Sequence, residues 1–296
     1  MPTSPKKGVN GRPLANGALV VLLGALWGSS YLLISLGLES FTPVSLIALR
    51  MAVASLALAL LSWGRVRLRR FFSARLVLIS LVNICIPFVL ITYGQSSLPS
   101  STVSVLSSTT PLFVIAFAIL LGVERVGAAQ VAGGAVAFVG VVLILTDDHG
   151  APALLPSALV LIASAIYACG NLAVARFFAD WNARELALSQ SAWSVVILAP
   201  LLFFQEWHTP SPSAILSVVW LGVVGSAVTY LLYFHLIRTA GSSRTASNTF
   251  VQPVVGVILG AIVLRESVTG GLLLGAGLVI AGMVLVWRRG SRRTDS

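Results

Sequence analysis

Apolar segments about as long as a lipid bilayer is thick recur along almost the whole chain. An α-helix needs roughly 18 to 23 such residues to cross the hydrocarbon core. The candidate spans are 17–36, 43–62, 76–94, 100–121, 128–146, 154–173, 187–205, 213–236, 244–264 and 270–287. Only 9% of the residues are charged, whereas soluble domains carry about a quarter. This composition excludes a soluble fold and predicts a polytopic membrane protein.

The residues inside these segments favour helices over a barrel. Lipid forces every backbone group to find its hydrogen-bond partner within the protein, so only helices and closed barrels span a membrane. Barrel strands alternate apolar and polar positions, and these segments do not. The sequence therefore predicts an all-α polytopic membrane protein with ten transmembrane helices. Because the first apolar run is about twenty residues long, we expect an uncleaved helix rather than a signal peptide.

One pattern occurs twice in the chain at a constant offset of 142 residues. The first copy holds Pro111, Glu124, Val126, Gly133 and Gly140, and the second holds Pro253, Glu266, Val268, Gly275 and Gly282. Ten helices in two related halves give five helices in each. Because five is odd, the second half enters the membrane upside down, as two inverted five-helix repeats with a site near the midplane.

The repeat and the basic residues together predict the domain organisation and the orientation. We expect a cytoplasmic N-terminal tail (1–14), the first repeat (15–146), the second, inverted repeat (147–287) and a cytoplasmic basic tail (288–296). If both termini are cytoplasmic, 17 of the 19 lysines and arginines lie on the inner side and only Arg265 on the outer side. The net charge of +10 forms no basic face, so no nucleic acid is expected as a partner.

Arg50 is the one formally charged residue well inside a span. At 1.5 Å per residue it lies roughly 10 Å below the outer end of its helix. Burying an arginine costs about 2.5–3.5 kcal/mol on insertion scales, so it should face protein or a water-filled cavity. Two interpretations stay open: contact with a substrate carboxylate or gating, and a structural role in capping carbonyls or snorkelling outward.

Prolines, amides and aromatic residues mark further positions inside the spans. Pro111 and Pro253 should each kink a helix and face a cavity or act as a hinge. Asn248 and Gln252 share one helix face and either line a pore or join helices. Trp27 and Tyr167 lie too deep for an interfacial belt. The candidate cavity residues are Trp27, Ser30, Tyr31, Arg50, Asn83, Tyr93, Thr110, Pro111, Tyr167, Asn171, Tyr230, Tyr233, Asn248, Gln252 and Pro253.

Residues that an enzyme would need are missing from the spans. No aspartate, glutamate or lysine lies in a span interior, and the three histidines are isolated. Cys85 and Cys169 fall inside apolar runs, where we expect buried, inert thiols rather than a disulfide or a metal site. We therefore expect no catalytic residue, no metal and no cofactor. A membrane enzyme or receptor is disfavoured, and transport remains.

Several stretches resemble the EamA-type transporters of the drug/metabolite transporter superfamily. They are Trp27-Gly28-Ser29-Ser30, the segment from Pro43 to Arg50, and the duplicated proline–glutamate pattern with its glycines. The resemblance covers essentially the whole chain and implies a multi-pass carrier of the bacterial inner membrane that works by alternating access. It also implies a cavity lined by helices one, three, four, six, eight and nine. The second half departs from the pattern, with Gln190 in place of a second arginine and Tyr167 in place of a second tryptophan.

The composition of this cavity suggests its substrate. It would be rich in tryptophan, tyrosine, asparagine, glutamine and serine but poor in charge. We therefore expect export of amino acids, with aromatic or other large neutral ones favoured, by a monomer whose partners are the small-molecule substrate and the bilayer. The alternative is a broad efflux carrier for drugs or another metabolite. Without a buried carboxylate, we expect facilitated diffusion or exchange rather than steep proton coupling.

Overall fold

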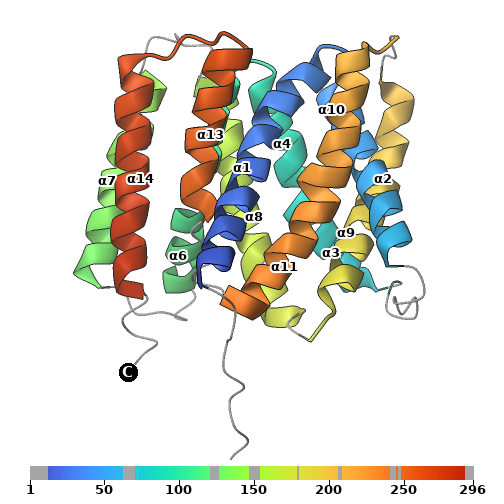
Figure 1. Cartoon of the computed structure of the whole chain (residues 1–296), viewed down its shortest axis with the longest axis horizontal. Helices are drawn as coiled ribbons and strands as arrows, with labels where there is room; N and C mark the ends of the chain where they lie inside the picture. Colours follow the sequence, from blue (N-terminus) through green and yellow to red (C-terminus); the bar gives the residue numbers. More distant parts are fainter. Residues whose placement is uncertain are drawn as a thin grey trace, which may run out of the picture.

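The computed structural model describes residues 13–62, 71, 73–120, 127–146, 154–178, 180–205, 209–240, 245 and 248–290, and every regular element in this part of the chain is helical. The helices stand side by side in one bundle (Figure 1). Seven helical segments are long and apolar enough to cross a membrane, and the described part holds three shorter apolar helices. Each of the ten predicted spans coincides with one of these segments, so the prediction of ten transmembrane helices is confirmed.

The first half comprises seven α-helices and one π-turn. They are α1 (Pro13–Leu38), α2 (Pro43–Leu61), α3 (Ala74–Ser80), the π-turn η2 (Leu81–Cys85), α4 (Ile86–Gln95), α5 (Ser100–Ser107), α6 (Thr110–Leu120) and α7 (Ala128–Thr146); α3, η2 and α4 together make one span, and so do α5 and α6.

The second half repeats this order with small differences. It holds α8 (Leu154–Phe177), α9 (Ala183–Leu198), the 3-10 turn η4 (Ala199–Phe204), α10 (Pro212–Gly222), the π-turn η5 (Val223–Val228), α11 (Thr229–Ala240), α13 (Asn248–Val263) and α14 (Gly270–Gly290). The span predicted to begin at 187 starts earlier, because the Asn182 side chain accepts a hydrogen bond from the Arg184 N–H at 3.0 Å and caps α9.

The repeated glycines explain how the two halves meet. Helices α7 and α14 pack together at one edge of the bundle (Figure 1). A Cβ on Gly140 would lie 2.6 Å from the Gly275 carbonyl oxygen, and one on Gly282 would overlap with that of Gly133. From the first contact to the second, the position on α7 falls by seven residues while the position on α14 rises by seven. The two helices are antiparallel, as an inverted repeat requires, and glycine lets their backbones touch.

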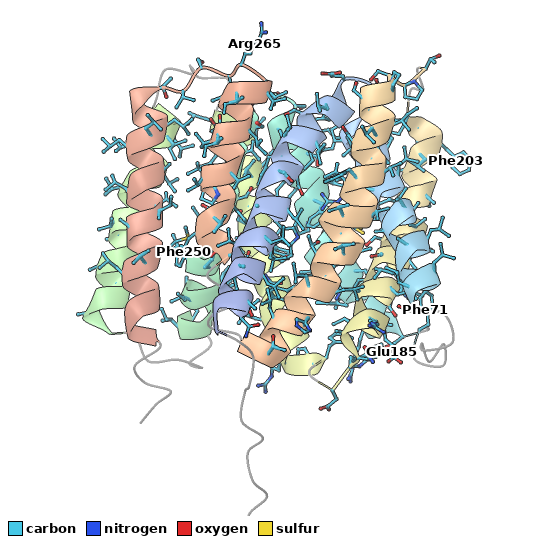
Figure 2. All side chains as sticks on the ribbon, in the orientation of Figure 1. Phe71, Glu185, Phe203, Phe250 and Arg265 are labelled. Carbon is cyan, nitrogen blue, oxygen red and sulfur yellow. The ribbon has the colours of Figure 1, made fainter. Side chains whose placement is uncertain are left out.

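Helices α2 and α9 show the same inversion at the other side of the bundle. Figure 2 places Phe71, which follows α2, and Glu185, in the first turn of α9, at one face of the molecule. Phe203, at the far end of the α9 span, and Arg265 lie toward the opposite face (Figure 2). These two faces are called the Phe71 face and the Arg265 face below. Helix α2 runs toward the Phe71 face and α9 runs away from it.

A glutamate of the repeat joins the second half to the first. Glu266 follows α13, and its carboxylate accepts the backbone N–H groups of Ser100 at 2.6 Å and Ser101 at 3.0 Å. These are N–H groups of the first turn of α5, which have no partner within their own helix. A carboxylate there also interacts favourably with the helix dipole. The equivalent Glu124 lies outside the described residues.

The fourth span is interrupted next to its proline. Helix α5 ends at Ser107 and α6 begins at Thr110. Pro111 has no N–H to give to the Ser107 carbonyl, and the Thr110 hydroxyl donates to that oxygen instead, at 2.8 Å. In the second half, Pro253 lies inside α13. One proline therefore accompanies a break and its counterpart does not.

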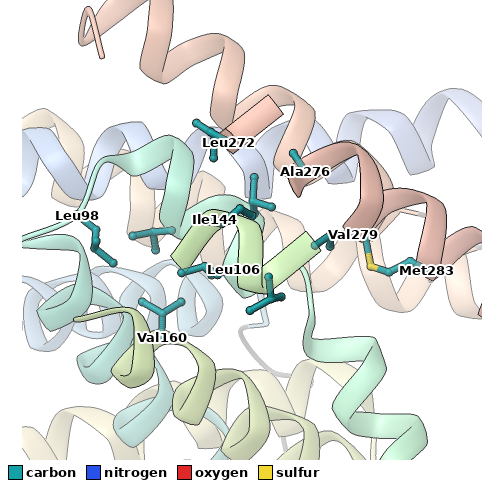
Figure 3. Close-up of a cluster of buried hydrophobic side chains, with 11 residues drawn as sticks. Leu98, Leu106, Ile144, Val160, Leu272, Ala276, Val279 and Met283 are labelled. Carbon is teal, nitrogen blue, oxygen red and sulfur yellow. The ribbon is translucent and has the colours of Figure 1, made fainter. Parts of the chain in front are cut away.

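Side chains of both halves share one apolar core. The cluster in Figure 3 combines Leu98, Leu106 and Ile144 of the first half with Val160, Leu272 and Val279 of the second. The cysteines differ from our expectation in one respect. Cys85 is buried, but Cys169 is exposed on α8, because an apolar run in a membrane protein has a lipid-facing side as well as a buried one.

Candidate substrate-binding site

Helix α2 brings Arg50 into the interior of the bundle, where the side chain is only 5% exposed. Its Nε donates to the Ser226 hydroxyl at 3.0 Å, and its Nη2 donates to the Gly225 carbonyl at 3.2 Å. The guanidinium carbon lies 4.8 Å from the centre of the Phe88 ring, within the range of a cation–π interaction. Helix α4 and the π-turn η5 therefore hold this arginine jointly.

The π-turn η5 creates the polar surface that receives the guanidinium. A π-turn bonds backbone groups five residues apart and locally widens the helix, a feature frequent at functional sites. Gly225 lies close to both groups within it, since a Cβ there would lie 3.2 Å from the Ser30 hydroxyl and 3.9 Å from Arg50 Nη2. Ser30 itself donates to the Leu26 carbonyl of α1 at 3.2 Å. Helices α1 and α2 thus meet η5 at this glycine.

Three tyrosines from three different helices lie near the arginine. Tyr31 of α1, Tyr167 of α8 and Tyr230 of α11 all lie close enough to interact electrostatically with Arg50. The Tyr167 ring also packs against Phe88, with 6.2 Å between ring centres. All three tyrosines and Phe88 are half-buried. We call Arg50, Phe88, Gly225, Ser226 and these three tyrosines the Arg50 cluster.

The positive charge of Arg50 has no ionic counterpart among the described residues. Within the described residues Arg50 forms no ion pair, and its hydrogen-bond partners are one hydroxyl and one carbonyl. An unpaired ion in a low-dielectric interior is costly, by several kcal/mol. The Phe88 ring offsets part of this cost. An anion placed beside Arg50 would offset the rest of this cost.

The pseudo-symmetric place in the bundle holds a neutral version of the same arrangement, again with one residue from each half. Gln190 of α9 accepts a hydrogen bond from Asn83 Nδ2 at 3.1 Å, and Asn83 lies in the π-turn η2. The two π-turns are separated by the same offset of 142 residues as the repeated pattern. Gly170 of α8 leaves room for Asn83, since a Cβ there would lie 2.6 Å from Asn83 Oδ1. An amide pair thus stands where the first site has Arg50 and the π-turn η5, with Asn83 at the position equivalent to Gly225.

The remaining predicted residues fall into separate groups. Trp27 packs against Tyr233, with 5.6 Å between ring centres. Asn248, only 1% exposed, donates to the Thr245 carbonyl at 2.6 Å and accepts from Gln252 at 2.8 Å. These amides bond within their own segment of the chain.

Other predicted residues lie at the ends or along the outside of helices. Thr110 and Pro111 form the start of α6, and Pro253 is buried in α13. Tyr93 is 43% exposed near the end of α4, and Asn171 is half-buried on α8. Neither Tyr93 nor Asn171 makes a side-chain hydrogen bond within the described part of the chain. The structure does not bring these residues into contact with Arg50.

Sequence reasoning overlooked Phe88, Gly225 and Ser226. The repeat offset could have pointed to two of them, because Phe88 corresponds to Tyr230 and Gly225 corresponds to Asn83. Tyr230 and Asn83 were both among the candidates. Ser226 carried no comparable signal, since serine is common in these spans.

The chain also matches a protein-family model twice, over residues 15–146 and 155–288, and the model describes the EamA-like transporter family. The chain belongs to this family. The resemblance expected from the sequence is therefore confirmed, and the protein is a membrane transporter rather than an enzyme. As an EamA-family transporter it acts on a small-molecule substrate.

Relatives of similar length carry transporter names. A "Probable terminal-alkyne amino-acid exporter" of Streptantibioticus cattleyicolor is 29% identical, and the alignment covers 94% of this chain and 95% of the relative. A "Probable amino-acid metabolite efflux pump" of Escherichia coli is 28% identical, with 93% and 97% covered. The "Uncharacterized inner membrane transporter YedA" of Escherichia coli is 29% identical, with 90% and 91% covered.

A solved structure supports the fold. It superposes with a TM-score of 0.68 over 92% of this chain and 97% of the other, at 18% sequence identity. At this level of identity, the similarity shows only that the two chains share a fold.

Proposed function

We propose that this EamA-family transporter exports amino acids, with aromatic or other large neutral ones favoured. The observation that carries the proposal is the Arg50 cluster. A buried guanidinium without an ion pair would bind the carboxylate that every amino acid carries. The aromatic rings around it would pack against an apolar or aromatic side chain.

Exposure of the aromatic residues supports a cavity at this place. Tyr31, Tyr167 and Tyr230 come from three different helices near Arg50, and each keeps part of its surface uncovered. We infer that these surfaces border a water-filled cavity, to which Trp27 and Tyr233 contribute a second aromatic pair. The inverted repeats would open it alternately to the two faces.

The proposed direction of transport and the proposed cellular membrane rest on the distribution of basic residues and on the names of the relatives. The Phe71 face would be cytoplasmic, with both termini, because 17 of the 19 basic residues then lie inside. The relatives named as amino-acid exporters support export rather than uptake. The relative named as an inner membrane transporter supports the bacterial inner membrane.

Transport by purified protein in proteoliposomes tests the proposal. Vesicles loaded with a mixture of labelled amino acids should release aromatic ones faster than protein-free vesicles do. A broad efflux carrier is the other outcome of this test, in which lipophilic drugs compete with amino acids or move faster. If no amino acid moves in either direction, the proposed function is wrong.

A further inference from the structure

We propose that the π-turn η5 is the positioning element that presents one edge of Arg50 to the substrate, and that Ser226 thereby determines specificity for a carboxylate. This inference rests on the proposed function and deepens it. The inference concerns how the protein holds Arg50, not whether Arg50 binds the substrate.

The hydrogen bonds of Arg50 use only one edge of its guanidinium. The group has five N–H donors in a planar fork. Nε and the adjacent Nη2 form the lateral edge, and both donate to η5, to Ser226 and Gly225. Nη1 makes no hydrogen bond within the described residues. The end-on edge, formed by Nη1 and the second Nη2 hydrogen, is therefore open to a carboxylate in bidentate geometry.

The orientation of the guanidinium plane is restrained as well as the direction of its lateral edge. Phe88 lies 4.8 Å from the guanidinium carbon, so the ring covers one face. The lateral hydrogen bonds prevent rotation about the side-chain axis, and the ring prevents tilting. A ligand therefore meets an arginine whose rotamer freedom is already lost, which favours binding because that entropy is not lost again.

The neutral counterpart limits the substrate to one carboxylate. Where the pseudo-symmetric site would offer a second cation, Asn83 donates to Gln190, and both side chains of this pair are neutral. The two pseudo-symmetric places, each built from residues of both halves, therefore differ in the anion that they can hold. A substrate with a single carboxylate, bound at Arg50, fits this difference.

Measuring KM for an aromatic amino acid, and inhibition by its decarboxylated amine, tests the assignment. Ser226→Ala should raise KM about tenfold, the effect of losing one hydrogen bond to a charged group, with a smaller change in kcat. In Ser226→Ala, the inhibition constant of the amine should change less than twofold. Ser226→Thr keeps a hydroxyl and should restore KM.

Ser217→Ala is the matched control. Ser217 is buried in α10 of the same span, but its hydroxyl donates to the Ser213 carbonyl at 2.8 Å within its own helix. The KM of the Ser217→Ala variant should equal that of the wild type. Thermal unfolding of each variant separates loss of folding from loss of positioning, because KM of the folded fraction does not depend on its amount.

The possible results separate this assignment from the proposed function. If the wild type transports amino acids but Ser226→Ala behaves like Ser217→Ala, the assignment alone is wrong. Equal weakening of amino acid and amine, or failure of Ser226→Thr to restore KM, also refutes it. If the wild type moves no amino acid, the proposed function and this assignment fall together.

Discussion

The contact between α7 and α14 gives the sharpest test of the inverted repeat. In the variant Gly140→Ala, the new Cβ would lie 2.6 Å from the Gly275 carbonyl oxygen and 2.9 Å from the Val279 nitrogen. Both atoms belong to backbone, so neither can turn aside as a side chain could. The two helices must separate to admit the methyl group.

The expected magnitude follows from two opposing effects. Overpacking of a tight core costs about 1–3 kcal/mol, whereas replacing glycine by alanine in a helix gains about 1 kcal/mol. We expect a net loss of up to about 2 kcal/mol in the free energy of unfolding. Thermal unfolding in detergent would show this as a lower Tm, by about 2–4 °C per kcal/mol if the scaling for soluble proteins applies.

Two other glycines on the same helices serve as controls. A Cβ on Gly134 of α7 or on Gly277 of α14 would meet nothing within 4 Å. Gly134→Ala and Gly277→Ala should therefore leave Tm unchanged or raise it slightly. If Gly140→Ala proves as stable as these two variants, the repeated glycines do not mark a close backbone approach, and our explanation of the repeat is wrong.

Three further substitutions probe the cluster and the helix ends. Arg50→Ala should reduce transport by purified protein at least tenfold while leaving expression nearly unchanged; equal loss of both would mean that the arginine is structural. Glu266→Gln keeps one acceptor but loses the charge at the start of α5, so Tm should fall by an amount matching about 0.5–1 kcal/mol; an unchanged Tm would contradict the capping role. Thr110→Val leaves the Ser107 carbonyl without its hydroxyl partner and should cost about 1 kcal/mol of stability in thermal unfolding, whereas Thr146→Val, whose hydroxyl lies on an exposed helix end, should cost less.

The sequence by itself determined the number of helices and their inverted arrangement. The length of each apolar run is a local property, and bilayer thickness converts it directly into a span. The constant offset between Pro111, Gly133 and Gly140 and their counterparts determined the two halves in the same way. An odd number of helices in each half then required the inversion, without any knowledge of which helices touch.

Only the tertiary structure decided which polar residues form a site. Arg50 and Ser226 lie 176 positions apart, and no local pattern relates two such residues. The same holds for Phe88, which stands out from other aromatic residues only because α4 places it over the guanidinium. Asn248 and Gln252 looked equally suited to a cavity, yet they bond to each other and to their own segment. Helix formation depends on neighbours in the chain, whereas a binding site depends on packing between distant helices.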